Sequence, residues 1–188
     1  PPFFDPKADD AANLGAIGGV IGPEMSHGFD DQGAQFDKDG NQNDWWTAED
    51  KANFNARTKV LADYFSTVEA VPGRKINGQL TLGENIGDNG GLNIAFRALQ
   101  NTLKVQDLGV KDGFTPEQRF FLSWARVWAS NMRPEYIEMI ITTDPHPEQR
   151  ARQRSPAPHR RLVQGLQRQE GPEALHPGKQ ACTHLVIV

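Results

Sequence analysis

The sequence predicts a mainly α-helical protein, and three observations support this fold class. Apolar residues recur at helical spacing in several stretches of the first 145 residues. Helix-capping residues precede two of these stretches. There is little clear strand signal anywhere in the chain. The segments between the predicted helices are turn-like and cover residues 37–44 (DKDGNQND), 71–79 (VPGRKINGQ) and 108–113 (LGVKDG).

The first two predicted helices lie in the N-terminal half. Residues 11–31 form a glycine-rich stretch that is apolar on one side. Residues 45–65 follow an N-cap candidate at Asp44 or Thr47. The apolar side of this second helix comprises Trp46, Phe54, Leu61 and Phe65.

Two further helices are predicted in the second half. Residues 82–105 carry one apolar side, and residues 115–131 begin with T-P-E, in which a capping threonine precedes a proline and an acid in the first turn. The apolar residues of these helices are Ile86, Leu92, Phe96, Leu99 and Leu103, and Phe120, Phe121, Trp124, Val127 and Trp128.

Composition excludes several classes of protein. With 37% hydrophobic residues, 23% charged residues and a net charge of −4, the chain gives no reason to expect a nucleic-acid partner, which would need a basic patch. We expect no membrane segment in this chain, because no run of about 18 apolar residues occurs. A single cysteine, Cys182, excludes an internal disulfide and a cysteine-rich zinc site. The opening PPFFDP, without an initiator Met or a visible signal peptide, suits a fragment.

A first candidate site lies in residues 21–31 (IGPEMSHGFDD), which differ at one position from the zinc-binding pattern H-E-x-x-H. Glu24 and His27 are three residues apart, on one face of the predicted helix. The apolar flank AIGGVIG predicts that this helix is buried, and buried Glu and His side chains need a partner or a function. Asp30 could orient the His27 ring. Alone, Glu-x-x-His is most often a solvated surface pair.

Two more candidates lie further along the chain. Glu84 and Asp88, in TLGENIGDNGGL, share one helix face and fit a zinc ligand with a supporting acid. An ordinary polar face followed by glycines explains this motif equally well. In TTDPH, Asp144 and His146 form a third candidate.

Together these motifs resemble the catalytic end of the neprilysin-like zinc metallopeptidases, which include endothelin-converting enzymes and bacterial endopeptidases. The resemblance covers residues 1–149, and its ordered, spaced motifs are far more specific than any one alone. It implies part of a gluzincin (thermolysin-like) catalytic subdomain, one zinc ion, peptide substrates, and an extracellular or periplasmic location for the family. The matching segments are PPFFDP, GGVIGPEMSHGFDDQGAQFDKDGNQNDWW, NGQLTLGENIGDNGGL, FFLSWARVW, RPEY and TTDPH.

The resemblance implies a role for each candidate residue. His27 and Glu84 resemble the second imidazole ligand and the carboxylate ligand of zinc, and Glu24 resembles the general base that activates a zinc-bound water. Roles are also implied for the remaining candidates: Asp30 and Asp88 resemble the acids that hold the ligand histidines, and His146 resembles the residue that hydrogen-bonds the oxyanion.

Pro23 departs from the family, because it stands where the first imidazole ligand belongs. Inside a helix, proline would lack an N–H and crowd the carbonyl of Gly19, at a cost of about 3 kcal/mol. Alternatively, Gly22 could break the helix and Pro23 could start a new one. In either case we expect weak zinc binding and little or no peptide cleavage. The alternative function is a catalytically dead protein that binds peptides.

Residues 150–188 also depart from the family. On composition alone, this arginine-, glutamine- and proline-rich tail predicts disorder. A frameshift near residue 149 explains it better. Residues 162–169 (LVQGLQRQ) can be encoded so that reading one base later gives W-Y-K-A-F-N-V-K. In the same frame, residues 151–154 give R-V-N-G and residues 185–187 give Trp and a stop, all in family order.

A calcium-binding loop is the remaining alternative, suggested by residues 37–44. An EF-hand loop needs glycine at position 6 and glutamate at position 12. With Gly40 at position 6, Trp46 falls at position 12, so the match fails. An ordinary turn explains this segment.

Overall fold

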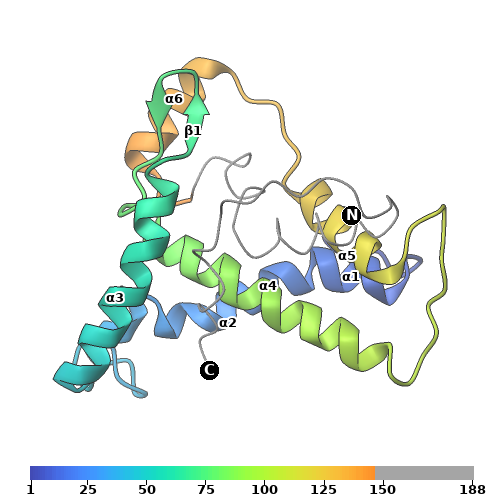
Figure 1. Cartoon of the computed structure of the whole chain (residues 1–188), viewed down its shortest axis with the longest axis horizontal. Helices are drawn as coiled ribbons and strands as arrows, with labels where there is room; N and C mark the ends of the chain where they lie inside the picture. Colours follow the sequence, from blue (N-terminus) through green and yellow to red (C-terminus); the bar gives the residue numbers. More distant parts are fainter. Residues whose placement is uncertain (147–188) are drawn as a thin grey trace, which may run out of the picture.

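The computed structural model describes residues 1–146, and within them the chain is mainly helical, as predicted (Figure 1). The tail from residue 150, where we predict a frameshift, lies outside the described residues. The α-helices are α1 (Asp10–Ala16), α2 (Gly18–Ser26), α3 (Ala48–Phe65), α4 (Leu82–Thr102), α5 (Pro116–Val127) and α6 (Pro134–Thr143). The shorter elements are the 3-10 turns η1 (His27–Phe29) and η2 (Gly33–Gln35) and the antiparallel strands β1 (Glu69–Val71) and β2 (Arg74–Lys75).

Side-chain caps start two of the predicted helices, α3 and α5. Thr47, rather than Asp44, caps α3, because its hydroxyl accepts the backbone N–H of Asp50 at 3.1 Å. Thr115 and Gln118 cap α5 reciprocally, each side chain accepting the other residue's backbone N–H. Helix α5 therefore begins where the sequence pattern indicated, whereas α3 begins at the second of its two cap candidates, after the predicted start at residue 45.

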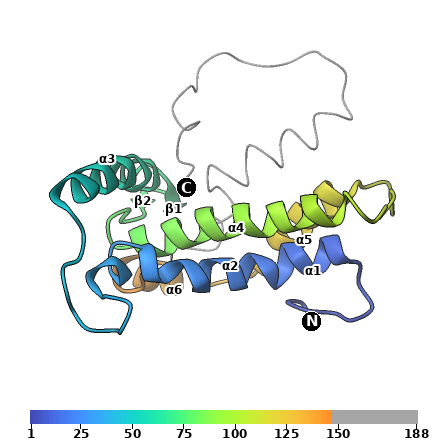
Figure 2. The same ribbon diagram turned by 90° about the horizontal axis from the view of Figure 1, so that it is seen from below.

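The single helix predicted over residues 11–31 is wrong in its extent. Ile17 has helical backbone angles and links α1 to α2, so the two run on almost in line (Figure 2). The helical stretch ends at Ser26 and gives way to η1. The carboxylate of Asp30 then accepts the backbone N–H groups of Gln32 and Gly33, which turns the chain away from the helix axis.

Two small elements were missed by the sequence pattern. Helix α6 has only ten residues, and its buried side chains are Ile137, Ile140 and Ile141. The β1–β2 hairpin falls partly in residues 71–79, which we expected to be only a turn; Gly73 makes that turn with φ +75°. Strands of three and two residues are too short to show an alternating pattern.

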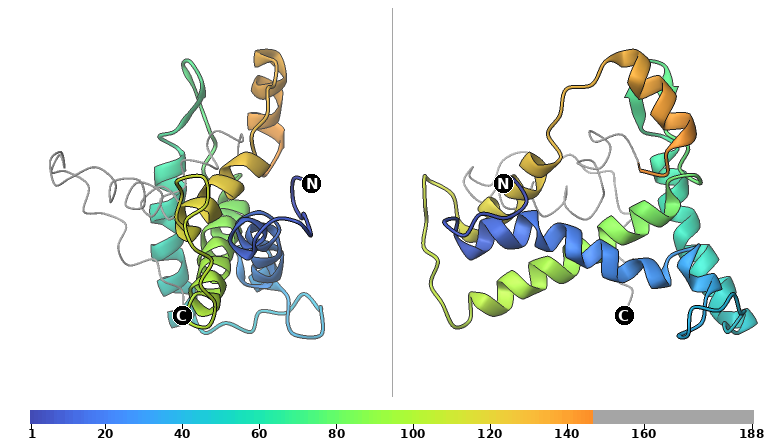
Figure 3. Two further views of the ribbon diagram at one scale, coloured as in Figure 1. Left: turned by 90° about the vertical axis from the view of Figure 1, so that its right-hand side faces the viewer. Right: turned by 180° about the vertical axis from the view of Figure 1, so that it is seen from behind.

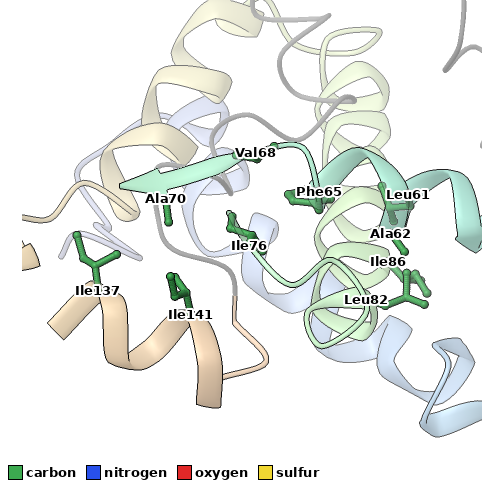
Figure 4. Packing of buried hydrophobic residues seen from close by; sticks show 10 residues of the cluster. All are labelled: Leu61, Ala62, Phe65, Val68, Ala70, Ile76, Leu82, Ile86, Ile137 and Ile141. Atoms are coloured by element: carbon green, nitrogen blue, oxygen red, sulfur yellow. The ribbon is translucent and has the colours of Figure 1, made fainter. Parts of the chain in front are cut away.

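Helix α4 is the central element of the described chain. It runs beside the α1–α2 line, with α3 crossing one end and α5 near the other (Figures 1, 2 and 3). One core cluster joins α3, the hairpin, the start of α4 and α6, and its members are shown in Figure 4. A second cluster joins α1, the rest of α4 and α5. No helix in residues 1–146 is both long and apolar enough to cross a membrane.

Candidate metal centre

The candidate centre lies where α2 and α4 pack together. A Cβ atom added at Gly22 would come within 2.5 Å of the carbonyl oxygen of Gly91, and one added at Gly91 would collide with the ring of Pro23. The two helix backbones are therefore in direct contact. This close approach brings His27, just after α2, to Glu84 in the first turn of α4.

His27 and Glu84 face each other across this crossing. The Nε2 atom of His27 lies 3.9 Å from Oε2 of Glu84. Gly87 provides the space, since a Cβ atom there would be 3.2 Å from Cε1 of the His27 ring. The structure thus brings together the two residues that the resemblance gave as zinc ligands.

Asp30 fixes the orientation of the His27 ring. Its Oδ2 accepts a hydrogen bond from Nδ1 of His27 at 2.8 Å, and its Oδ1 accepts the backbone N–H groups of Gln32 and Gly33 at 2.8 and 2.7 Å. The residue is only 5% exposed. With Nδ1 bonded to Asp30, Nε2 is the ring nitrogen that faces Glu84, and metal-binding histidines are oriented by a carboxylate in the same way.

The charges around His27 change its acidity. Burial alone would lower the pKa of His27. The hydrogen bond to Asp30 and the negative charges of Glu84, Asp30 and Glu24 outweigh burial, so the pKa of His27 is raised from its usual value. The site therefore attracts positive charge.

His146, from the third sequence candidate, also reaches this place. Its Nε2 lies 3.4 Å from Oε2 of Glu84, and its Nδ1 bonds Oδ1 of Asp144 at 2.8 Å. The side chain of His146 is 57% exposed, whereas that of Glu84 is only 18% exposed. His146 thus reaches the carboxylate of Glu84, which lies 62 positions earlier in the chain and also faces His27.

Two other candidates differ in burial. We expected a buried Glu24, and this is wrong: Glu24 is exposed, because α4 covers only the side of α2 that carries Gly19, Gly22 and Pro23. An exposed carboxylate remains accessible to water and to a peptide. Asp88 is buried in α4, 4% exposed, one turn after Glu84.

Pro23 lies inside α2 and does not start a new helix. It is buried, and its carbonyl accepts the N–H of His27. A Cβ atom at Gly87 would lie 3.5 Å from the Cβ of Pro23, so the proline and the His27 imidazole border the same space beside Gly87. Proline offers no donor atom there. Zinc sites of the catalytic kind use three protein ligands. Within residues 1–146, no group of three His, Cys, Asp or Glu side chains could hold a metal ion. The residues present therefore do not make a complete zinc site as they stand.

Sequence reasoning missed the glycines that permit this geometry. Gly22 and Gly91 let two backbones touch, and Gly87 leaves room for an imidazole. The signal was present as glycines within predicted helices, where a packing or functional reason is needed to offset their cost. Nothing in the sequence pattern pairs a glycine of one helix with that of another.

Comparisons with known proteins find similar proteins over most of this chain. A profile described as Peptidase family M13 matches residues 1–159. Neprilysin-1 of Caenorhabditis elegans is 42% identical over 157 residues, which are 80% of this chain and 21% of that protein. Human neprilysin is 42% identical over 151 residues, 78% of this chain and 20% of that protein. The chain thus spans about a fifth of the length of these relatives.

Solved structures show the same similarity. The zinc metalloprotease Zmp1 of Mycobacterium tuberculosis, in complex with an inhibitor, is 46% identical and superposes with a TM-score of 0.77, over 81% of this chain and 24% of that one. PepO from Lactobacillus rhamnosis is 35% identical with a TM-score of 0.73, over 88% of this chain and 25% of that one.

Proposed function

Because the chain belongs to peptidase family M13, we propose that it carries the zinc-site part of a metalloendopeptidase catalytic domain, and that Pro23 weakens this site. The chain is homologous to the zinc metalloproteases of this family. The main support for the finer proposal is the convergence of His27 and Glu84 at 3.9 Å, with Asp30 bonded behind the imidazole. Peptides are the proposed substrates.

Each candidate residue of the site would have a separate role. His27 and Glu84 would hold the metal, which when bound supplies Lewis-acid polarisation and a more acidic water. Glu24, exposed beside His27, would take up the proton of the attacking water. His146 would donate a hydrogen bond to the oxyanion, and Asp88 would support the ligand position at residue 23.

Pro23 limits both binding and catalysis in this proposal. It removes one of three protein ligands, whereas loss of even a residue that only supports a ligand lowers metal affinity about 10–100-fold. It also removes a backbone hydrogen bond inside α2. The chain as written is therefore expected to bind zinc weakly and to cleave peptides poorly or not at all.

Replacing Pro23 with histidine tests the proposal. We expect Pro23→His to raise zinc affinity at least about 100-fold, measured by competition with a chromogenic chelator. Cleavage of an internally quenched peptide should then become zinc-dependent.

The matched control is Pro23→Ala, which restores the backbone N–H without adding a ligand. It should leave zinc affinity near that of the parent chain. Equal zinc affinity of Pro23→His and the parent chain, or equal gains in the histidine and alanine variants, would refute the proposal.

The alternative is a protein of the same fold that binds peptides without cutting them. Pro23 favours it, because every other candidate residue of the site is retained while one ligand is lost. Peptide binding by the parent chain that is unchanged by a zinc chelator would support this alternative.

A further inference from the structure

A cavity lies at the N-terminal end of α3, and neither His27 nor Glu84 lines it. Its volume is about 410 Å³. The segment from Asp31 to Trp46 folds back beside the first turns of α3 and, together with them, forms the walls (Figure 1). Sites for small molecules have volumes of roughly 300–1,000 Å³. The cavity is therefore large enough for a small ligand.

Hydrogen bonds hold the loop that forms one wall. The backbones of Phe36 and Gln42 make an antiparallel bridge. The indole Nε1 of Trp45 donates to the carbonyl of Phe36 at 2.9 Å, and the backbone N–H of Asn43 donates to the carbonyl of Gln35 at 3.1 Å. The loop thus presents its side chains to the cavity from a fixed backbone.

Two aromatic rings form the apolar part of the walls. Trp46 and Phe54 both line the cavity, and their rings meet edge to face, with centroids 5.2 Å apart and planes at 68°. The ring of Trp45 also contacts that of Trp46, at 5.3 Å. Such contacts fix the plane of an aromatic ring. A fixed indole gives the C–H groups of a ligand a flat apolar surface.

Polar groups of the walls lack partners. Within residues 1–146, the buried Nε1 of Trp46 has no hydrogen-bond partner, and the same is true of the buried Oδ1 of Asp31. Gln42 and Asn55 add exposed side-chain amides to the lining. Leaving a buried donor or acceptor unpaired is costly, and a ligand that bonds it removes this cost. The cavity therefore offers a ligand both donors and acceptors.

The charges of the walls indicate an uncharged ligand. Asp44 and Lys51 both line the cavity and form an ion pair with each other. Asp31 adds a second carboxylate, which would repel an anion. An ammonium group would suit Asp31, but it has no lone pair to accept the N–H of Trp46. A hydroxyl group both donates and accepts, so it suits both residues.

We propose that this cavity binds a neutral saccharide. One sugar ring would lie against Trp46, and its hydroxyl groups would bond Nε1 of Trp46, the carboxylate of Asp31 and the amides of Gln42 and Asn55. A pyranose combines an apolar C–H face with a rim of hydroxyl groups, and these walls combine a fixed indole with donors and acceptors. A free sugar and a glycan attached to a peptide present the same ring. The inference depends neither on zinc nor on Pro23.

The test titrates the full-length chain, in the presence of EDTA, with maltose, cellobiose and N,N′-diacetylchitobiose. Isothermal titration calorimetry measures the affinity, and choline and inorganic phosphate are the cationic and anionic probes. We expect saturable binding of at least one disaccharide and no binding of phosphate. A glycopeptide that carries the bound disaccharide distinguishes the two sources: a lower Kd identifies a peptide-borne glycan, and an equal Kd identifies the sugar itself as the ligand.

Variants of the walls locate the binding. Trp46→Ala should lower the affinity at least about 10-fold. Trp46→Phe keeps an aromatic ring and removes the N–H, so it should lower the affinity about 3–10-fold, as should Asn55→Ala. Asn53→Ala is the matched control, because Asn53 is exposed on the same helix and does not line the cavity; it should have no effect. Circular dichroism verifies that each variant folds.

The absence of saturable binding by all three disaccharides would overturn the inference. Binding that Trp46→Phe and Asn55→Ala leave unchanged would also overturn it, since the sugar would then lie elsewhere. Binding of choline without binding of a disaccharide would identify an ammonium site and would equally refute a saccharide site. Because EDTA is present throughout, failure of the proposed zinc site does not affect these outcomes.

Discussion

At the scale of single residues, Asp9 joins three parts of the chain through one carboxylate. It caps α1 by accepting the N–H of Ala12 at 3.0 Å, and it pairs with Arg119 at 2.8 Å and Lys111 at 3.3 Å. Arg119 in turn donates to the carbonyls of Leu108, Gly109 and Phe114, so it holds the loop before α5. Burial would raise the pKa of Asp9, but the N–H of Ala12 and the charges of Lys111 and Arg119 outweigh it and lower that pKa.

Asp9→Asn should therefore destabilise the chain in a pH-dependent way. Asparagine still caps a helix, so the change removes mainly the charge, at about 1–2 kcal/mol near neutral pH. A lowered folded pKa means that the parent's advantage is present above the ordinary value of 3.8 and is lost as the pH falls through the folded pKa. Thermal melts from pH 7 to pH 2 measure this. A stability difference that stays constant over this range would contradict the assignment.

At the scale of elements, the α2–α4 contact determines the geometry of the site. Gly22 and Gly91 meet backbone to backbone, and the ring of Pro23 packs directly on Gly91. Gly90, one residue earlier, has only the Ser26 hydroxyl near the place of a Cβ, at 3.9 Å. Adjacent glycines of one helix thus differ completely in what a methyl group would meet.

Alanine substitutions at these two glycines should have opposite effects. Gly91→Ala forces the helices apart and should cost about 1–3 kcal/mol or more, because backbone atoms cannot move aside easily. Gly90→Ala should stabilise the chain by about 0.5–1 kcal/mol, since alanine is the better helix former. Urea unfolding of both variants measures the difference. Equal effects at the two positions would show that the backbones do not touch here.

The sequence predicted the elements with strong local signals and missed those without them. Helices α3, α4 and α5 follow long apolar stripes, and Thr115 gives a complete capping signal. Helix α6 has only ten residues, and the hairpin strands have three and two. Such short elements are formed by packing against the first core cluster, which joins residues far apart in the sequence.

At the scale of the whole molecule, α4 connects the site to both core clusters. Glu84 lies between Leu82 and Ile86, which belong to the first cluster, while Leu92 and Leu99 further along belong to the second. Helix α6 packs on the same first cluster and carries the chain to His146. The motifs identified the site residues through the family resemblance. Local spacing could not predict that His27, Glu84 and His146 meet, because this depends on how three separate helices pack.

The coding DNA tests the second departure from the family, the tail from residue 150. The frameshift remains a prediction, and it requires particular codons. Read one base later, the codons for residues 162–169 should give W-Y-K-A-F-N-V-K, and those for residues 151–154 should give R-V-N-G. Sequencing the coding DNA around these codons measures this directly. Synonymous codons that do not permit these shifted translations would show that the tail has another origin.

The glycine contact between α2 and α4 has a consequence for metal selectivity. Because no side chain separates the helices at Gly22 and Gly91, position 23 lies directly against α4. Cysteine, aspartate or histidine at position 23 would present sulfur, oxygen or nitrogen, respectively, beside His27 and Glu84. Soft thiolates, hard carboxylates and imidazoles favour different metals. The affinities of these variants for zinc, cobalt and manganese would thus show how a single donor atom sets the metal preference.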